Sequence, residues 1–179
     1  EEVRDAASGD ARPSRAGDVM VLVRRLSQVR HLEDALVRAG LRFTVEGGKS
    51  FFDRQEVHEA LAVLKAIDDP SDRLSLVAAL RSSFLGVSDR DIVAYALAGG
   101  GLELGRTVEE EKPGAATVGP ALELLGRYHE RRTRLSVAAL LEALYDETRV
   151  LAAVTLTRRG ESAIANLLKV VALARQSQG

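Results

Sequence analysis

The sequence predicts a mainly α-helical protein with a small βαβ piece near its N-terminal end. Two observations support this expectation. An apolar run at residues 19–23 and an alternating run at residues 41–46 flank an amphipathic stretch, which gives the order strand, helix, strand. From residue 57 to residue 174, leucine, valine and isoleucine recur at helical spacing instead. The helical pattern therefore dominates the chain.

The two expected strands differ in character. Val19 to Val23 is continuously apolar between Asp18 and Arg24, which is typical of a strand buried on both faces. Residues 41–46 alternate between apolar and polar side chains, as in a half-exposed strand. A helix between them makes a βαβ unit with a right-handed crossover. That helix is expected to begin after Ser27, to end at Gly40, and to bury Val29, Leu32, Leu36 and Val37.

The remainder is expected to be helical. Asp68-Asp69-Pro70 should end the first of these helices, and Gly99-Gly100-Gly101 should end the third, which Ser88 or Asp89 caps. The expected helices cover residues 57–67, 74–80, 92–97, 118–128, 137–145, 150–156 and 164–174. A mobile loop is expected at about residues 99–119, because that stretch is acidic and contains glycine and proline.

We therefore divide the chain into a truncated helix with a linker (1–17), the βαβ piece (18–50) and a helical domain (51–179). Both ends resemble cut helices, so we expect an expressed fragment. Charge is nearly balanced, with 25 basic and 26 acidic residues, so any contact with nucleic acid must be local. Cysteine is absent, which excludes disulfides and thiolate metal sites. With neither a membrane-length apolar run nor a signal peptide, we expect a cytoplasmic protein.

Residues 47–57 form the most informative stretch, Gly-Gly-Lys-Ser-Phe-Phe-Asp-Arg-Gln-Glu-Val. On physical grounds alone, the favoured interpretation is an ordinary strand-to-helix corner with Phe51 and Phe52 as its plug and Asp53 as the helix cap. The alternative is a phosphate site, since Gly47-Gly48 lets backbone amides approach a ligand closely and Lys49 and Arg54 flank the turn. Ligands of such sheets gather at the carboxyl ends of the strands, where Arg24-Arg25 also lies.

Other catalytic or binding patterns are weak. A Gly-x-x-x-x-Gly-Lys-Ser/Thr loop is absent, because position 43 is Phe where that pattern needs glycine. His31, His58 and His129 lie on separate expected helices without ligand spacing, which argues against a metal site. The densest basic cluster, Arg131-Arg132 with Arg134, is interpreted as a solvated helix end in preference to a DNA-binding patch.

Three strings closely resemble the UvrD/Rep/PcrA helicases and their AddA-like and RecB-like helicase–nuclease relatives. They are Val-Leu-Val-Arg-Arg-x-Ser-Gln-x-Arg (21–30), Leu-Glu-x-Ala-Leu-x-x-Ala-Gly (32–40) and Val-Glu-Gly-Gly-x-x-Phe-Phe-Asp-Arg-Gln-Glu-Val (45–57). The resemblance continues through about residue 90. It returns more loosely at residues 135–175, with Glu147-Thr-Arg149, Arg159-Gly-Glu161 and Ala165-Asn-Leu-Leu-Lys169.

The resemblance implies that residues 18–50 are a βαβ piece of the second RecA-like motor domain and that 51–179 form most of a helical accessory domain. The segment 23–30 would contact the translocated single strand, although Leu26 departs from the family's polar residue. The family's Gly-Ile-Gly turn grips duplex phosphates. Here it reads Gly86-Val87-Ser88, with Leu85 in place of a basic residue, which favours the AddA-like or RecB-like branch and leaves a plain helix connector as the alternative. The candidate nucleic-acid-binding residues are Arg24, Arg25, Gln28, Arg30, Gly47, Gly48, Lys49, Arg54 and Gly86.

By this resemblance, the parent protein is expected to be an ATP-dependent DNA helicase or helicase–nuclease that binds ATP and magnesium between two motor domains. The fragment contributes part of the DNA track and a regulatory body, holds no catalytic residue, metal or cofactor, and is inactive alone. Expected partners are single-stranded DNA, with duplex DNA left open, and a partner subunit, but no membrane. The alternative is a degenerate helicase-like module that scaffolds a DNA-repair complex. A phosphate loop in the parent reading frame distinguishes the two.

Overall fold

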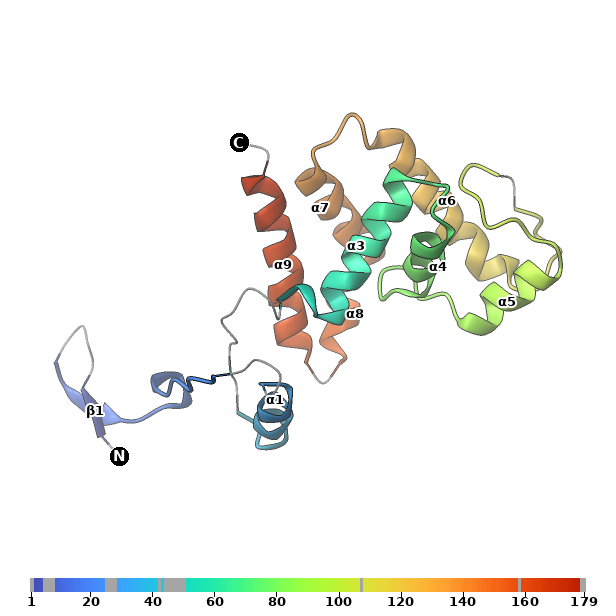
Figure 1. Cartoon of the computed structure of the whole chain (residues 1–179). Helices are drawn as coiled ribbons and strands as arrows, with labels where there is room; N and C mark the ends of the chain where they lie inside the picture. The colour runs from blue at the N-terminus through green and yellow to red at the C-terminus, as the bar shows by residue number, and fades with distance from the viewer. Residues whose placement is uncertain are drawn as a thin grey trace. The chain divides into compact units, whose positions relative to one another are not determined.

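The structure is a computed structural model of the 179-residue chain, and it describes residues 2–4, 9–24, 29–41, 43, 51–106, 108–157 and 159–177. The chain forms two compact units, residues 1–50 and 51–179 (Figure 1). Each is described below by itself. The expectation of a mainly helical protein is confirmed, since the strands of the described residues are confined to the first unit.

The first unit begins with a small antiparallel pair of strands. Strand β1 (Glu2–Arg4) pairs with β2 (Ala11–Pro13), with Val3 opposite Arg12. A short 3-10 helix, η1 (Ala16–Asp18), follows. Arg12 donates two hydrogen bonds of 2.7 Å to the Asp18 carboxylate. This guanidinium, with the amide of Arg15, holds the pKa of Asp18 well below its usual range.

The truncated helix expected at residues 1–17 is wrong. Its described residues form β1, β2 and the start of η1. Gly9, which has φ +74°, lies between the two strands, and Pro13 lacks the N–H that a helix interior needs. A helix of so few residues would also be marginal in water, because nucleation costs more than one turn of hydrogen bonds returns. Pairing with a second strand satisfies the backbone of this segment instead.

The strand expected at Val19–Val23 is also wrong. These residues are not part of a ladder, and their side chains are between 43% and 88% exposed. A strand buried on both faces needs neighbouring strands, and an isolated segment has none. For the second expected strand, Leu41 and Phe43 are not in a strand, and the rest of residues 41–46 lie outside the described residues.

The helix between them is confirmed as α1 (Val29–Arg38). Gly40 has φ +69° and ends it as expected. Its amide bonds to the Val37 carbonyl, and the amide of Leu41 bonds to the Leu36 carbonyl. This pair of bonds is the glycine-based motif that commonly ends α-helices.

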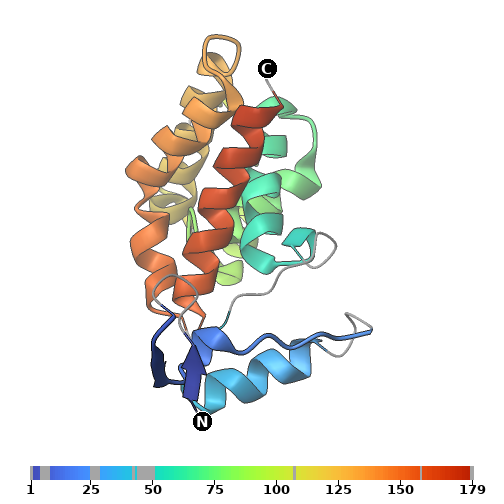
Figure 2. The ribbon, with the colours of Figure 1, turned by 90° about the vertical axis from the view of Figure 1, so that its left-hand side faces the viewer.

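The second unit is a bundle of helices (Figures 1 and 2). Helix α3 packs against α4, α6 and α9, while α9 also packs against α7 and α8, and α5 packs against α6. Fully buried leucines fill the interior, among them Leu76, Leu80, Leu125, Leu141, Leu144 and Leu167. The helices are α3 (Gln55–Asp68), α4 (Arg73–Arg81), α5 (Asp89–Leu97), α6 (Ala115–Arg131), α7 (Val137–Thr148), α8 (Val150–Thr155) and α9 (Gly160–Gln176).

Side-chain caps define where several helices begin. The Ser88 side chain accepts the amide of Asp91 and starts α5, which settles the choice between Ser88 and Asp89. Ser136 starts α7 in the same way. Arg54 is the N-cap residue of α3 and makes no such side-chain bond, so the cap expected at Asp53 is wrong.

The loop between α5 and α6 is shorter than expected, because α6 begins at Ala115. The Lys112 ammonium donates to the Gly99 carbonyl at 3.0 Å and pairs with Glu109 at 2.7 Å, so it caps the C-terminal end of α5. Gly114 packs so closely on α5 that an added Cβ would lie 2.2 Å from the Asp91 carbonyl oxygen. These contacts fix both ends of the loop. Its partly buried Leu102, Leu104 and Val108 pack against the core.

Candidate nucleic-acid interface

The candidate binding residues are divided between the two units. Arg24 lies in the first unit, exposed at the end of the apolar segment 19–23, and Arg30 lies in α1. In the second unit, Arg54 is half-buried at the start of α3, and Gly86 lies in the turn between α4 and α5. The other candidates lie outside the described residues. They are Arg25, Gln28, Gly47, Gly48 and Lys49.

Residues 51–59 connect the start of the helical unit to its other helices. The Phe51 ring is 6% exposed, and the Lys169 ammonium on α9 lies 4.9 Å from its centroid. Phe52 packs edge-on against Phe51 but is itself 54% exposed, so only the first aromatic is a hydrophobic plug. Asn166 on α9 donates a 2.6 Å hydrogen bond to Glu56. The described part of the string, residues 51–57, therefore stabilises packing within this unit.

The same segment supports the turn between α4 and α5. Gln55 donates to one oxygen of the Glu59 carboxylate at 2.8 Å, and the other oxygen accepts the amide of Ser83 at 2.9 Å. Sequence reasoning missed Glu59, since its spacing matched only the amphipathic pattern of a helix. The signal that was available was the position of Gln55 and Glu59, one helical turn apart on the same face.

Backbone hydrogen bonds hold the turn itself, residues 82–88, in one conformation. The amides of Leu85 and Gly86 both bond to the Ser82 carbonyl, and the amide of Val87 bonds to the Leu80 carbonyl. Gly86 is exposed with φ +62°, a conformation that favours glycine. Phe84 and Val87 are buried in the core on either side of it. Gly86 is thus presented to solvent by a turn with two buried anchors.

Across the turn, Arg81 at the end of α4 pairs with Asp89 at the start of α5, at 2.5 Å. The first bonded amide of α5 is that of Asp91. The amides of Asp89 and Arg90 precede it, and such N-terminal amides have no partner within a helix and attract anions. The acidic side chains of Asp89 and Asp91 in this first turn oppose that attraction, whereas the exposed Arg90 favours it.

The family model for the UvrD-like helicase C-terminal domain matches residues 4–132, well over half of the chain. The chain belongs to this family. Individual UvrD-like relatives agree with the match. The chain is 38% identical over 73 residues, 41% of its length, to "ATP-dependent DNA helicase UvrD1" of Mycobacterium tuberculosis. It is 30% identical over 140 residues, 73% of its length, to "ATP-dependent DNA helicase PcrA" of Bacillus subtilis.

A helicase–nuclease relative matches over the greatest extent of these three. The UvrD-like chain is 28% identical over 175 residues, 98% of its length, to an ATP-dependent helicase/nuclease subunit of Leuconostoc mesenteroides. The match covers 14% of that relative, 19% of the B. subtilis protein and 10% of the M. tuberculosis protein. This UvrD-like chain therefore spans between about a tenth and a fifth of the length of these curated relatives.

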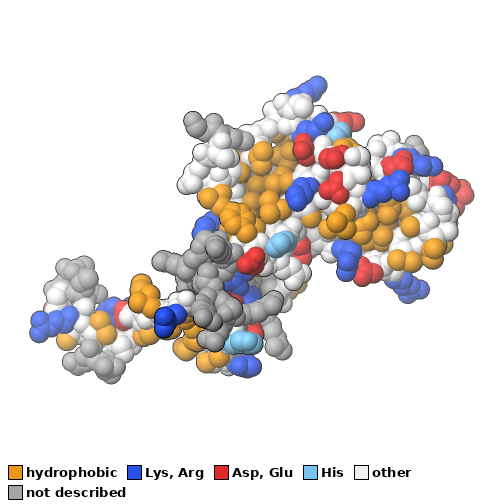
Figure 3. Space-filling model, viewed as in Figure 1, with side chains coloured by type: hydrophobic (Ala, Val, Ile, Leu, Met, Phe, Trp, Pro, Cys, Tyr) orange, Lys and Arg blue, Asp and Glu red, His pale blue; other side chains and the backbone are white. Residues whose placement is uncertain are grey.

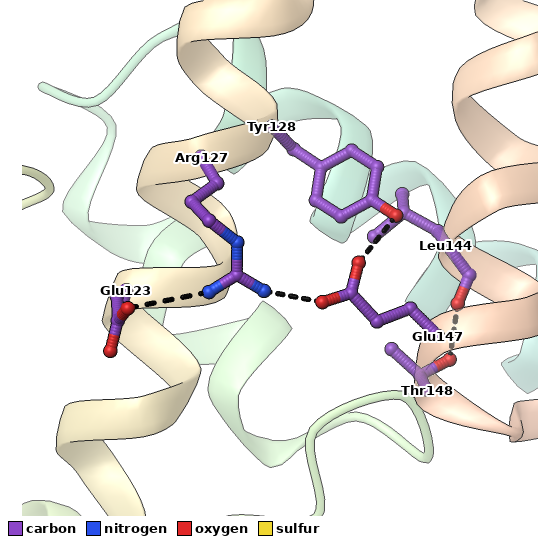
Figure 4. Close-up of polar contacts among 6 residues, drawn as sticks. All are labelled: Glu123, Arg127, Tyr128, Leu144, Glu147 and Thr148. Carbon is purple, nitrogen blue, oxygen red and sulfur yellow. Dashed lines mark hydrogen bonds and ion pairs between the residues drawn. The ribbon is translucent and has the colours of Figure 1, made fainter.

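A polar cluster of the UvrD-like helical unit joins α6 to α7 (Figure 4). The Tyr128 hydroxyl donates to Glu147 at 2.9 Å, and Arg127 bridges Glu147 and Glu123. Burial, and then the hydrogen bond and charge of Glu147, raise the pKa of Tyr128 to about 12. The phenol is neutral at physiological pH and unsuited to act as a base. We therefore assign this cluster to the packing of α6 on α7.

The basic cluster at the end of α6 also makes contacts within the unit. Arg131 lies 5.6 Å from the centre of the Tyr128 ring. His129 Nδ1 lies 2.6 Å from the Ile67 carbonyl oxygen, so this nitrogen carries a proton, and Arg132 donates to His129 Nε2 at 3.2 Å. Arg131 and Arg134 are nonetheless exposed, as expected of a solvated helix end. On the face shown in Figure 3, acidic and basic side chains of the helical unit are interspersed.

Within the described ranges, acidic and histidine side chains form no group of three or more that would hold a metal ion. No helix built from the described residues combines the length and apolar character required to cross a bilayer.

Proposed function

We propose that this chain is part of an ATP-dependent DNA helicase or helicase–nuclease. The observation that carries the proposal is the match of residues 4–132 to the UvrD-like C-terminal domain. The relatives named above are described as ATP-dependent DNA helicases or as part of a helicase/nuclease. The similarity of nearly the whole chain to a subunit of this last kind favours a parent that works with a partner.

In this proposal, residues 18–50 belong to the second RecA-like motor domain and residues 51–179 to a helical accessory domain. The exposed apolar segment Val19–Val23 supports the first assignment. Soluble proteins rarely leave five consecutive apolar side chains in water, and such a segment marks a surface that another part covers. The strands that cover it are supplied by the rest of the motor domain.

The DNA contacts divide in the same way. Arg24 lies beside the strand segment and contributes to the single-strand track, together with Arg25, Gln28 and Arg30. In the accessory domain, the Gly86 turn presents the first amides of α5 to a duplex phosphate. ATP and magnesium bind the parent through a phosphate loop that this sequence does not contain. Phosphoryl transfer needs that loop, a metal-holding acid and an arginine, so the chain alone does not hydrolyse ATP.

The test is made on the parent protein and on this chain in parallel. The parent is expected to show ATPase activity stimulated by single-stranded DNA and to unwind a tailed duplex, while the chain alone shows neither. A parent reading frame without a phosphate loop, combined with no DNA-stimulated ATPase, would overturn the enzyme assignment. That result would support the scaffold alternative, a degenerate helicase-like subunit.

A further inference from the structure

The turn between α4 and α5 is held by a carboxylate from a third helix. Glu59 on α3 accepts the amide of Ser83 at 2.9 Å, and Gln55 one turn earlier orients the same carboxylate with a 2.8 Å hydrogen bond. Both oxygens of Glu59 are therefore used, one for the turn and one for its own orientation. Hydrogen bonds to an ionised acceptor are shorter and stronger than those between neutral groups.

The other amides of the turn bond locally. Phe84 bonds to the Ser82 hydroxyl at 3.3 Å, and Leu85, Gly86 and Val87 bond to carbonyls of Ser82 and Leu80. Among the described residues, the bond from Ser83 to Glu59 is the one hydrogen bond that ties this turn's backbone to a helix other than α4 and α5. Removing it leaves the backbone of this turn held only by hydrogen bonds within the turn and to α4, and by packing.

We propose that Glu59 is a positioning residue for DNA binding by the Gly86 turn. Its carboxylate fixes Ser83, and through it the direction in which Gly86 and the first amides of α5 face a phosphate. The inference rests on the proposed function of the turn. Glu59 has two effects of opposite sign on DNA binding. Its negative charge repels a nearby phosphate, whereas its hydrogen bond to Ser83 holds the turn in the conformation that binds the phosphate.

Three substitutions distinguish a positioning role of Glu59 from an effect of its negative charge. Glu59→Gln removes the charge but keeps an oxygen acceptor of the same reach, and Glu59→Ala removes both. Gln55→Ala removes only the group that orients Glu59, at an exposed position where folding is not at risk. The matched control is Glu130→Ala, which deletes the same charge from an exposed position on α6.

Binding is measured with the full 179-residue chain and a fluorescein-labelled duplex carrying a single-stranded tail, at low salt. We expect Glu59→Ala to bind roughly three- to tenfold more weakly, since one charge-assisted hydrogen bond is lost. Glu59→Gln and Glu130→Ala are expected to remain within about twofold of the wild type, and Gln55→Ala to lie between. Hydrogen exchange of the Ser83 amide is expected to accelerate about tenfold in Glu59→Ala and to be preserved in Glu59→Gln.

Three other outcomes would contradict the positioning role of Glu59. Tighter binding by both Glu59 variants shows that the residue acts as a repulsive charge, and it overturns the positioning role. Faster exchange at Ser83 with unchanged binding overturns it as well. If the wild-type chain does not bind the duplex at low salt, the duplex contact in the proposed function is wrong, and the role of Glu59 in DNA binding is wrong with it.

Discussion

Asn166 on α9 donates a 2.6 Å hydrogen bond to Glu56 on α3, between residues 110 positions apart in the sequence. Both side chains are half-buried. The contact lies near Phe51, the first residue of the helical unit, whose ring is covered by Lys169 from the same helix α9. The start of this unit is therefore held in place by its last helix. The stability of the bundle is expected to depend on α9 remaining folded.

Exchanging the two partners of this bond tests its contribution. Asn166→Asp places two carboxylates together and should lower the free energy of unfolding by about 1–3 kcal/mol, since the donor is lost in a half-buried site. Adding Glu56→Gln restores the hydrogen bond with its direction reversed, because the amide introduced at position 56 donates to the carboxylate introduced at position 166. The double variant should recover at least half of the loss in urea unfolding followed by circular dichroism. Strictly additive losses would show that the two side chains are not coupled.

Tyr128 should titrate near pH 12 in the folded protein, because burial and the Glu147 carboxylate disfavour the phenolate. Its pKa in an unfolded chain is about 10. Because the folded pKa is the higher one, the stability contributed by Tyr128 is fully present below pH 10 and is lost as the pH rises through about 12. Glu147→Gln should bring the pKa of Tyr128 down towards 10 without reaching it, since burial remains.

The measurement is a phenolate absorbance titration, with Tyr128→Phe subtracted to isolate this tyrosine. Burial also raises the pKa of Tyr145, whose hydroxyl donates to the Leu167 carbonyl at 3.0 Å. That transition should be unchanged by Glu147→Gln, which provides an internal control. An unchanged Tyr128 transition in Glu147→Gln would show that the contact with Glu147 does not form in solution.

Gly114 should be far less tolerant of substitution than Gly105, although both have φ above +70°. An added Cβ at Gly114 would lie 2.2 Å from the Asp91 carbonyl oxygen, whereas at Gly105 nothing lies within 4 Å. We expect Gly105→Ala to cost about 1 kcal/mol, the conformational penalty alone. Gly114→Ala should cost roughly 3 kcal/mol or more, because α5 and α6 must also separate. Thermal unfolding of the two variants side by side makes the comparison, and equal losses would contradict the close packing of α6 on α5.

The sequence predicted the helices of the second unit well, because each buries an apolar face whose spacing is visible locally. The prediction failed for segments whose conformation depends on pairing with residues far away in the sequence. Val19–Val23 has the composition of a buried strand, but no strand of the described residues pairs with it, and β1 and β2 are too short for a periodic pattern. For the candidate site, the sequence pointed to residues 47–57, of which the structure describes residues 51–57, packed against α9. The partners Ser83 and Asn166 are set by packing of distant helices, which residue spacing does not encode.

The purified chain should show no DNA-stimulated ATPase activity. The sequence lacks the Gly-x-x-x-x-Gly-Lys-Ser/Thr loop, and Gly47-Gly48-Lys49-Ser50 shares only part of it. The measurement is phosphate release with and without single-stranded DNA, compared with a buffer control and with Lys49→Ala. Turnover above the control that disappears in Lys49→Ala would revive the phosphate-loop interpretation of residues 47–50.

In the proposed function, Arg24 and Arg30 contact the single strand bound by the parent protein. On single strands, each phosphate that a cation neutralises contributes a slope of roughly −0.7 to the dependence of log affinity on log salt. The Arg24→Ala/Arg30→Ala double variant should therefore bind a labelled oligonucleotide more weakly and with a slope shallower by about 1.4, if each arginine meets one phosphate. Arg131→Ala/Arg134→Ala removes the same charge from the last residue of α6 and the turn after it, and should leave the slope unchanged. If the Arg24 and Arg30 variant retains both its affinity and its DNA-stimulated ATPase, the track assignment is wrong, and these arginines belong to a solvated face whose exposed ion pairs contribute only about 0–1 kcal/mol.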